Sequence, residues 1–430
     1  MYTKALKWSL IIVVLLSVLC PVGAYFGVVV VFITAIQARK SRQILGSLSA
    51  DKAALIMLFS ILLSLIYSKD IYMSLGAVFI LCLNIGLYLV LMVELKKIEL
   101  QKYYKLLNIA CLLACIFGIY QFVSGNMNIE KSWVDEKSFG SLDRVYSTLL
   151  NPNIFAGYLA INLSFALARI RSLREDILLT SNIVLSSICL LVTYSRGGFA
   201  AFGAAMLVLC LLKERKRGLA LYLSVMVAAF FVLNSTGLNN RAELGSVYHD
   251  SSSLYRLEIW KAALNMFLNS PIFGNGIGTT WYYLSSGSDK LYRYILHSHN
   301  IYLQVAAEMG IVGLCAFINL IGNKVWEGYG LLKEKVSKEE IYIIQGFIAC
   351  TAGISIHGLI DAVVFVPALS LVFMGYFALY NRVISKYRLE AAYILEVPGL
   401  FNSKGVPKLL GGKCACEYKH QGEKDKAYQA

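Results

Sequence analysis

The amino-acid sequence predicts an all-α polytopic membrane protein with about twelve transmembrane helices. Its 430 residues are 58% hydrophobic and only 15% charged, and their mean hydropathy is +0.63. Water-soluble globular proteins of this size rarely reach these values, so the composition indicates that lipid is the solvent. Since a helix needs about 20 apolar residues to cross the hydrocarbon core, a chain of this length has room for about a dozen crossings.

Apolar runs of spanning length recur along the chain, and each predicts one helix. The runs fall at residues 7–20, 22–37, 53–68, 71–93, 104–123, 149–168, 177–194, 198–212, 218–233, 299–322, 341–363 and 364–381. The first two runs are short and join at 21–23, where they could form a tight hairpin. We expect one transmembrane body over residues 1–382 and a cytoplasmic tail over 383–430.

Loop charges predict the orientation, because Lys and Arg accumulate on the cytoplasmic side of short loops. If the N-terminus lies inside, most of the 40 Lys and Arg residues fall in inward segments. We therefore expect a multi-pass protein of the cytoplasmic (inner) membrane with both termini cytoplasmic. These loops account for the net charge of +14, so the charge does not indicate a nucleic-acid partner.

The ten cysteines do not predict a disulfide framework. Eight of them lie in or at the ends of apolar runs, where they are interpreted as small core residues. The remaining two form a C-x-C at Cys414 and Cys416, and no convincing set of further ligands stands at zinc-site spacing.

Two outward segments, about 124–148 and 234–298, are longer than a connection requires, and such loops are usually functional or disordered. The second would form a large extracytoplasmic loop. Within it, apolar residues recur at helical spacing at Leu257, Trp260, Leu264 and Phe267. We expect an amphipathic helix over 253–268 and a tight turn over 274–278. The helix could lie on the bilayer surface, or it could form a lid over a membrane-facing cavity.

Five short motifs between residues 194 and 313 carry a family resemblance. They are Tyr194-Ser-Arg-Gly-Gly-Phe199, Arg256-Leu-Glu-Ile-Trp260, Pro271-Ile-Phe-Gly-Asn-Gly-Ile-Gly278, His297-Ser-His-Asn-Ile-Tyr-Leu303 and Glu308-Met-Gly-Ile-Val-Gly313. Their order and spacing resemble the bacterial O-antigen ligase and polymerase superfamily over about residues 145–380. The most specific match is the His-Asn dipeptide at 299 and 300, followed by Gly310-x-x-Gly313.

The resemblance implies a GT-C-like membrane glycosyltransferase whose active site is extracytoplasmic. Its donor would be a glycan linked to undecaprenyl diphosphate, and its acceptor would be a glycan or lipid-linked sugar. The resemblance implies that the enzyme uses no metal ion and no cofactor. We expect inverting transfer by an O-antigen ligase or a surface polysaccharide polymerase, and the sequence does not distinguish between the two.

Breaking a glycosyl diphosphate at its anomeric carbon leaves negative charge on the diphosphate, so the site needs fixed cations. An arginine guanidinium stays ionised and matches two phosphate oxygens. Arg196 and Arg256 are therefore the candidates for binding the diphosphate. Alternatively, Arg196 snorkels to the membrane interface and Arg256 is a solvated surface charge.

Attack by a sugar hydroxyl requires a group that accepts its proton, and histidine titrates near neutrality. His299 matches the position of the general base proposed for the family, and the neighbouring His297 and Asn300 could support it. His357 and Asp361 are four residues apart, which we expect to put them on one helical face. They could pair there and hold the site, or they could serve stability alone.

A secondary transporter, or an exporter of polysaccharide precursors, is the rival interpretation, because twelve helices with cytoplasmic ends are also a common transporter plan. Against it, the charged candidates cluster at the outer surface of the second half of the chain, and no internal repeat is evident. A non-catalytic assembly protein is a third interpretation. It predicts that neither arginine matters.

Overall fold

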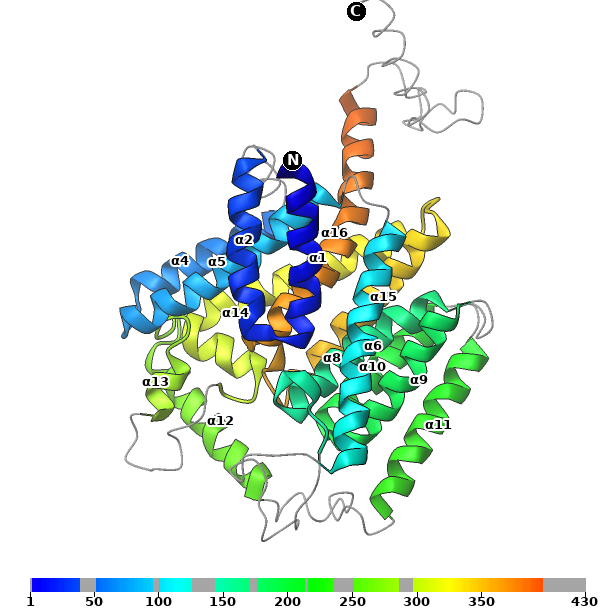
Figure 1. The fold of residues 1–430 in the computed structure, drawn as a ribbon. Helices are drawn as coiled ribbons and strands as arrows, with labels where there is room; N and C mark the ends of the chain where they lie inside the picture. The colour runs from blue at the N-terminus through cyan, green and yellow to red at the C-terminus, as the bar shows by residue number, and fades with distance from the viewer. Residues whose placement is uncertain are drawn as a thin grey trace, which may run out of the picture. The chain divides into compact units, whose positions relative to one another are not determined.

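Helices make up every regular element of the described part of the chain (Figure 1). The structure is a computed structural model that describes residues 2–38, 52–95, 100–125, 144–170, 176–212, 216–235, 251–285 and 297–396. The chain divides into two compact units, Met1–Tyr380 and Asn381–Ala430, and the site belongs to the first. The predicted Cys-x-Cys tail motif and parts of both long outward segments lie outside the described residues.

Each of the predicted apolar runs falls on a helix. The helices are α1 (Tyr2–Leu19), α2 (Pro21–Gln37), α4 (Lys52–Ile66), α5 (Ile71–Glu94), α6 (Leu100–Ser124), α8 (Pro152–Arg169), α9 (Ile177–Val192), α10 (Arg196–Leu212), α11 (Lys216–Ser235), α12 (Ser251–Asn269), α13 (Thr280–Ser285), α14 (Ile301–Leu331), α15 (Lys338–His357) and α16 (Pro367–Glu396), with the 3-10 turns η2 (Ser147–Leu149) and η6 (Val363–Phe365).

Among the described residues, five helices are long and apolar enough to cross a membrane: α5, α6, α14, α15 and α16 over Pro367–Arg388. Several others are apolar but shorter, among them α2, α4, α9 and α10. The all-helical architecture and the membrane-spanning character are therefore confirmed. The number of crossings and the GT-C-like fold stay predictions.

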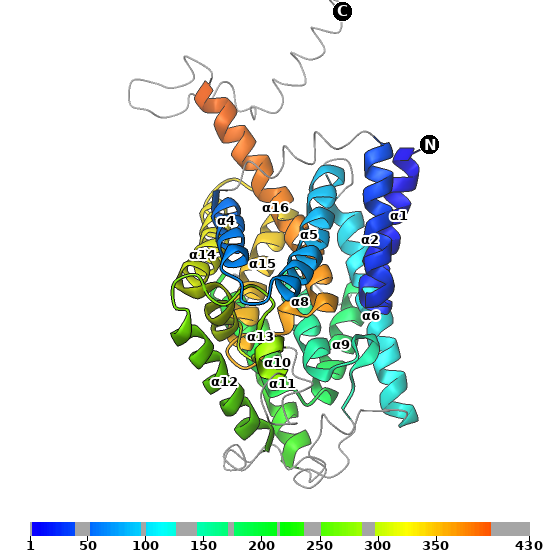
Figure 2. The ribbon, with the colours of Figure 1, turned by 90° about the vertical axis from the view of Figure 1, so that its left-hand side faces the viewer.

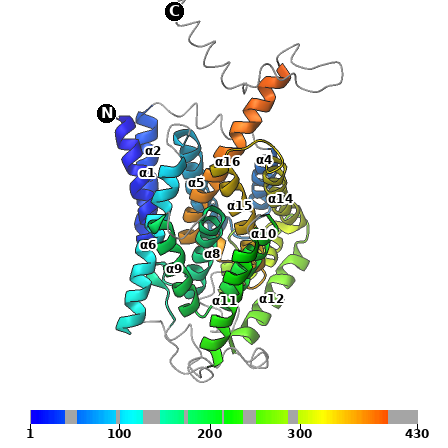
Figure 3. The same cartoon turned by 90° about the vertical axis from the view of Figure 1, so that its right-hand side faces the viewer.

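The helix α8 lies at the centre of the packing that positions the site. It packs against α9, α10 and α15, and nearly all of its residues are buried, as expected for a helix that is apolar on every side (Figures 2 and 3). Small residues permit the close approach. A Cβ added at Gly198 of α10 would lie 2.4 Å from Cβ of Ala156 on α8. Close backbone contact through small residues is how helices associate in lipid.

Buried amides also join the helices around α8. Asn162 on α8 donates to Asn182 on α9 at 3.0 Å, and Tyr376 on α16 donates to Asn162 at 3.0 Å. Asn182 in turn donates to Asn108 on α6. Hydrogen bonds between helices stabilise their packing where no water competes. They hold α8 as a rigid platform.

The helix α14 is broken at Gly310, where φ is +65° and ψ is −166°. The break leaves carbonyls without hydrogen-bond donors within the helix, and the Pro271–Gly278 loop supplies these donors. Asn275 and Gly276 donate their backbone N–H groups to the carbonyls of Ala307 and Glu308 at 3.1 and 2.9 Å. The predicted tight turn is thus a loop docked on α14, and this docking accounts for two of the recognition motifs.

The predicted amphipathic helix is present as α12, but it packs through a different face. The residues that it buries are Ile259, Ala263 and Met266. Ala263 and Met266 contact Ala307 of α14, whereas Leu257 and Leu264 are 48% and 44% exposed. A narrow face with a central alanine lets the two helices approach closely, and the larger apolar residues stay exposed on α12. Whether the helix lies on the bilayer surface or forms a lid stays a prediction.

Candidate active site

The loop before α14 holds the predicted base. Asn300 caps α14: its Oδ1 accepts the backbone N–H groups of Tyr302 and Leu303 at 2.9 and 3.0 Å. Its Nδ2 donates to the carbonyl of Leu359, in the loop after α15, at 3.1 Å. The His-Asn dipeptide therefore has a structural explanation, because the asparagine fixes the start of the helix and joins the two loops that meet at the site.

His299 has a backbone φ of +53°, which non-glycine residues rarely adopt. Its carbonyl accepts a hydrogen bond from Nε1 of Trp260 on α12 at 3.3 Å. Ile301, two residues further on, donates its N–H to the carbonyl of Gly358 at 2.7 Å. These contacts hold His299 in a conformation that costs free energy, and such positions concentrate at functional sites.

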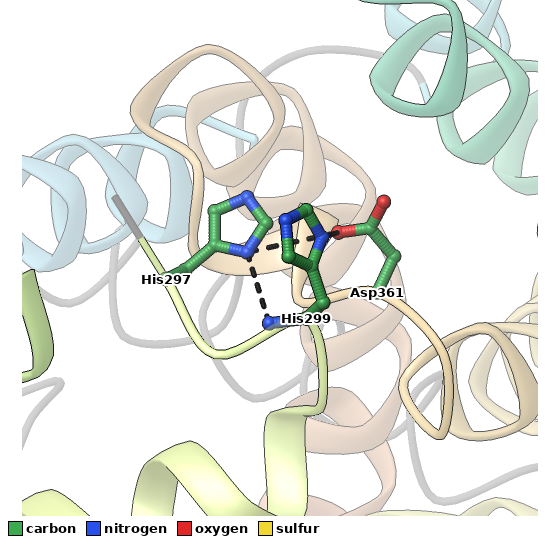
Figure 4. A group of neighbouring side chains, drawn as sticks. All are labelled: His297, His299 and Asp361. Atoms are coloured by element: carbon green, nitrogen blue, oxygen red, sulfur yellow. Dashed lines mark hydrogen bonds and ion pairs between the residues drawn. The ribbon is translucent and has the colours of Figure 1, made fainter. Parts of the chain in front are cut away.

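The imidazole of His299 faces the carboxylate of Asp361 (Figure 4). The distance from Nδ1 to Oδ1 is 3.1 Å, and the side chains are 25% and 4% exposed. Burial alone would raise the pKa of Asp361. The charges of His299, His297 and Arg256 and the hydrogen bond from His299 outweigh it and hold that pKa well below its usual range. An ionised carboxylate only accepts, so Nδ1 of His299 donates to it, and in a neutral imidazole the lone pair is then on Nε2.

His297 lies on the other side of this pair, with Nδ1 3.7 Å from Oδ1 of Asp361. The same Nδ1 accepts the backbone N–H of His299 at 3.3 Å, and the two imidazole rings are 4.3 Å apart (Figure 4). Burial, with the charges of His299 and Arg256, lowers the pKa of His297 to about 4, and Asp361 opposes the shift. His297 is thus neutral at neutral pH.

The expectation that His357 and Asp361 lie on one helical face is wrong. The helix α15 ends at His357, and Asp361 lies in the loop that follows. There the Asp361 carboxylate contacts His299 and Asn153, whose Nδ2 donates to Oδ2 at 2.9 Å. His357 is 2% exposed, and a Cβ added at Gly197 would lie 2.8 Å from its ring. Its observed contact is therefore tight packing against the start of α10.

Of the two predicted arginines, Arg256 lies near this group, and Arg196 follows a turn that Asn153 connects to it. Arg256 lies half-buried on α12, close enough for its charge to lower the pKa of Asp361. Arg196 is the first residue of α10 and is also half-buried. The preceding residues form a turn in which Tyr194 has a φ of +49° and the Ser195 hydroxyl accepts the N–H of Gly198 at 3.2 Å. That turn is joined to Asp361 through Asn153.

The sequence analysis missed Asn153 and Arg144. Asn153 lies in the first turn of α8, and Arg144 precedes η2 and is 7% exposed. The Arg144 Nη2 donates to Oδ1 of Asn153 at 2.9 Å. The one sequence signal was an arginine at the end of an outward segment, followed by the Asn-Pro-Asn start of a helix.

Three of these side chains could hold a metal ion. His297, His299 and Asp361 each offer one ligand atom, and these atoms lie within 4.8 Å of one another. Two imidazoles and a carboxylate suit zinc better than magnesium. Each group already has a hydrogen-bond partner in the protein, however, so the cluster is satisfied by its own contacts. A metal-free site stays the prediction.

Comparison with known proteins adds the family. Residues 181–318 match the model of a family described as O-antigen ligase. The matched region includes Arg196, Arg256, His297, His299 and Asn300.

The chain is 22% identical to the teichuronic acid biosynthesis protein TuaE of Bacillus subtilis over 303 residues, which cover 67% of this chain and 62% of that protein. It is 35% identical over 77 residues to a Rickettsia typhi protein named as a candidate polysaccharide ligase, covering 16% of this chain and 19% of that protein. A Rickettsia conorii protein of the same description is 34% identical over 77 residues, with the same coverage. The chain thus spans less than two thirds of the length of these relatives.

Proposed function

We propose that the chain is a member of the O-antigen ligase and polymerase superfamily and that it transfers a glycan from undecaprenyl diphosphate to an acceptor sugar. The matched region and the relatives support the family. The reaction takes place on the outer face of the cytoplasmic membrane. The acceptor is either a lipid-linked sugar, as for a ligase, or another glycan repeat, as for a polymerase. The observation that carries the proposal is the 3.1 Å hydrogen bond between His299 and Asp361 beside Arg256.

The base is Nε2 of His299. It accepts the proton of the acceptor hydroxyl while the hydroxyl oxygen attacks the anomeric carbon of the donor. Asp361 keeps the imidazole in the tautomer that leaves this nitrogen free, and it stabilises the imidazolium that forms, as the buried carboxylate does in a catalytic triad. His297 is neutral, so it adds no positive charge that would oppose protonation of His299.

The bond that breaks joins the anomeric carbon to the diphosphate oxygen, and the electron pair leaves with the diphosphate. Arg196 and Arg256 stabilise the charge on the departing group through paired hydrogen bonds to phosphate oxygens. Since attack and departure occur on opposite sides of the carbon, the anomeric configuration inverts. No step requires a metal ion.

The experiment supplies purified protein in detergent with an undecaprenyl-diphosphate-linked glycan and candidate acceptors. We expect transfer without any gradient, and activity that is unchanged by EDTA. A single addition identifies a ligase, and a ladder of products identifies a polymerase. Absence of product with every acceptor, together with gradient-driven uptake of the donor glycan into proteoliposomes, would replace this proposal with the transporter.

A further inference from the structure

A partly buried asparagine connects the two sides of the site. Asn153 donates from Nδ2 to Oδ2 of Asp361 at 2.9 Å. Its Oδ1 accepts from Nη2 of Arg144 at 2.9 Å and from the hydroxyl of Ser195 at 3.0 Å. One amide thus contacts the carboxylate that faces the base, the turn before Arg196, and a buried arginine.

The chemistry of these partners fixes the orientation of the Asn153 amide. A guanidinium can only donate and an ionised carboxylate can only accept. If the amide were reversed, its NH2 would face Arg144 and its oxygen would face Asp361, so both contacts would oppose like groups. The Asn153 amide can therefore adopt only one orientation, with its oxygen toward Arg144 and its NH2 toward Asp361.

Asn153 is not needed to start its own helix. The cap of α8 is Asn151, whose Oδ1 accepts the backbone N–H groups of Asn153 and Ile154 at 2.8 and 3.3 Å. Pro152 occupies the first helical position, where its fixed φ suits the helix. The side chain of Asn153 is thereby free for contacts elsewhere, and it projects from a buried and rigid helix.

Arg144 extends the connection to the turn before Arg196, which is one of the two proposed diphosphate ligands. Its Nε donates to the carbonyl of Thr193 at 2.9 Å. Thr193 precedes the turn in which Tyr194 has positive φ, and Arg196 follows that turn. The hydrogen bonds of Asn153 and Arg144 together fix the position of this strained turn relative to Asp361. Supports of this kind keep catalytic groups within reach of productive geometry.

We propose that Asn153 is a positioning residue that aligns the Asp361 carboxylate with His299 and fixes this pair relative to the turn that carries Arg196. The inference rests on the proposed function, since it assigns the support of its base. It also predicts that the effects of substitutions at positions 153 and 361 depend on each other. The reason is that the side chain at 153, by donating or accepting, decides which atom of the side chain at 361 faces His299.

Two substitutions expose this dependence. In D361N, the NH2 of Asn153 is satisfied only by the new amide's oxygen, which turns the new NH2 toward Nδ1 of His299. Nδ1 must then accept, the proton moves to Nε2, and the base is lost. In the double variant D361N/N153D, position 153 can only accept. The amide at 361 then turns over, and its oxygen again faces His299.

The test measures transfer by wild type, N153D, D361N and the double variant in detergent. We expect the double variant to be about tenfold more active than D361N, although it carries one more substitution. Asn153→Asp by itself loses activity because two carboxylates then oppose each other. Its activity relative to wild type rises as pH falls, since a shared proton restores a donor at position 153.

Matched controls separate positioning from folding. Asn323→Asp makes the same change at an exposed residue that bonds only within α14, and we expect unchanged activity. A double variant no more active than D361N would overturn the proposal. If the double variant does not fold, a pH-independent ratio of N153D to wild type would overturn it equally. Failure of N153D itself to fold would assign Asn153 to stability alone. Retained activity of H299A would instead remove the proposed base, whatever the exchange shows.

Discussion

Replacing Asp361 by asparagine tests how the base is held. The change keeps the shape of the side chain and removes its charge. Asp361 accepts from His299 at Oδ1 and from Asn153 at Oδ2, so the two oxygens face two donors. An amide has one acceptor and one donor, and it cannot satisfy both contacts. In either orientation, the NH2 group of the new amide faces a donor, which is either Nδ1–H of His299 or the NH2 of Asn153.

The two orientations bracket the expected loss. If the amide oxygen faces His299, the NH2 of Asn153 loses its partner, which costs about 1–3 kcal/mol and leaves the correct tautomer populated at about one part in 5 to 150. If the amide NH2 faces His299, the base is protonated at Nε2, a situation that lowers the rate of a triad enzyme by about 10⁴. Asp361→Asn should therefore lower the rate of transfer by between about fivefold and about 10⁴-fold.

The assay is single-turnover transfer from a lipid-linked glycan, with donor affinity measured separately. Affinity should change little, since Arg196 and Arg256, and not Asp361 itself, make the proposed contacts to the diphosphate. Asp70→Asn is the control: Asp70 caps α5 through the N–H groups of Tyr72 and Met73, and asparagine caps a helix as well as aspartate does. A D361N rate within about threefold of wild type would refute the account of His299, because a change of that size is smaller than the cost of one mismatched hydrogen bond.

Three further predictions follow from single positions. Arg256→Lys should lower kcat/KM about tenfold, because lysine keeps the charge but loses the paired N–H groups that bind two phosphate oxygens. Arg256→Ala should lower kcat/KM by about 10² to 10³. Equal activity of the two variants would contradict the diphosphate contact. Gly310→Ala should destabilise the protein by more than about 1 kcal/mol, since a Cβ there lies 2.2 Å from the Ile272 carbonyl at positive φ. Gly322→Ala, on the same helix with nothing within 4 Å, should not destabilise it, and thermal unfolding in detergent compares the two. His297 has a pKa of about 4 when folded, so the unfolded chain binds an additional proton between about pH 6.5 and 4. Stability should fall by up to about 3 kcal/mol as pH falls through that window, and His297→Gln should flatten this slope.

The sequence was most informative where a local pattern decides the structure. Apolar runs predicted the helices because burial in lipid depends on the composition of each segment. The motifs pointed to Arg256, His299 and Asn300, which lie around one loop junction.

Contacts between distant segments were not predictable in this way. The hydrogen bond between Asn153 and Asp361 joins residues 208 positions apart, and no period or spacing encodes it. The contact of α12 with α14 through Ala263 was not predicted, because hydrophobic periodicity marks the row of large apolar residues and not the small residue that allows close approach. Asp361 was assigned to a helix that ends at His357, so its partner was missed.

The most direct test of the central claim is single-turnover transfer by His299→Ala with the donor already bound. We predict that the variant is folded in the membrane, binds the undecaprenyl-diphosphate-linked glycan with wild-type affinity, and forms product about 10²- to 10⁴-fold more slowly. Product formed at the wild-type rate by this variant would contradict the account, because the imidazole of His299 would then not be needed to accept the proton of the acceptor hydroxyl.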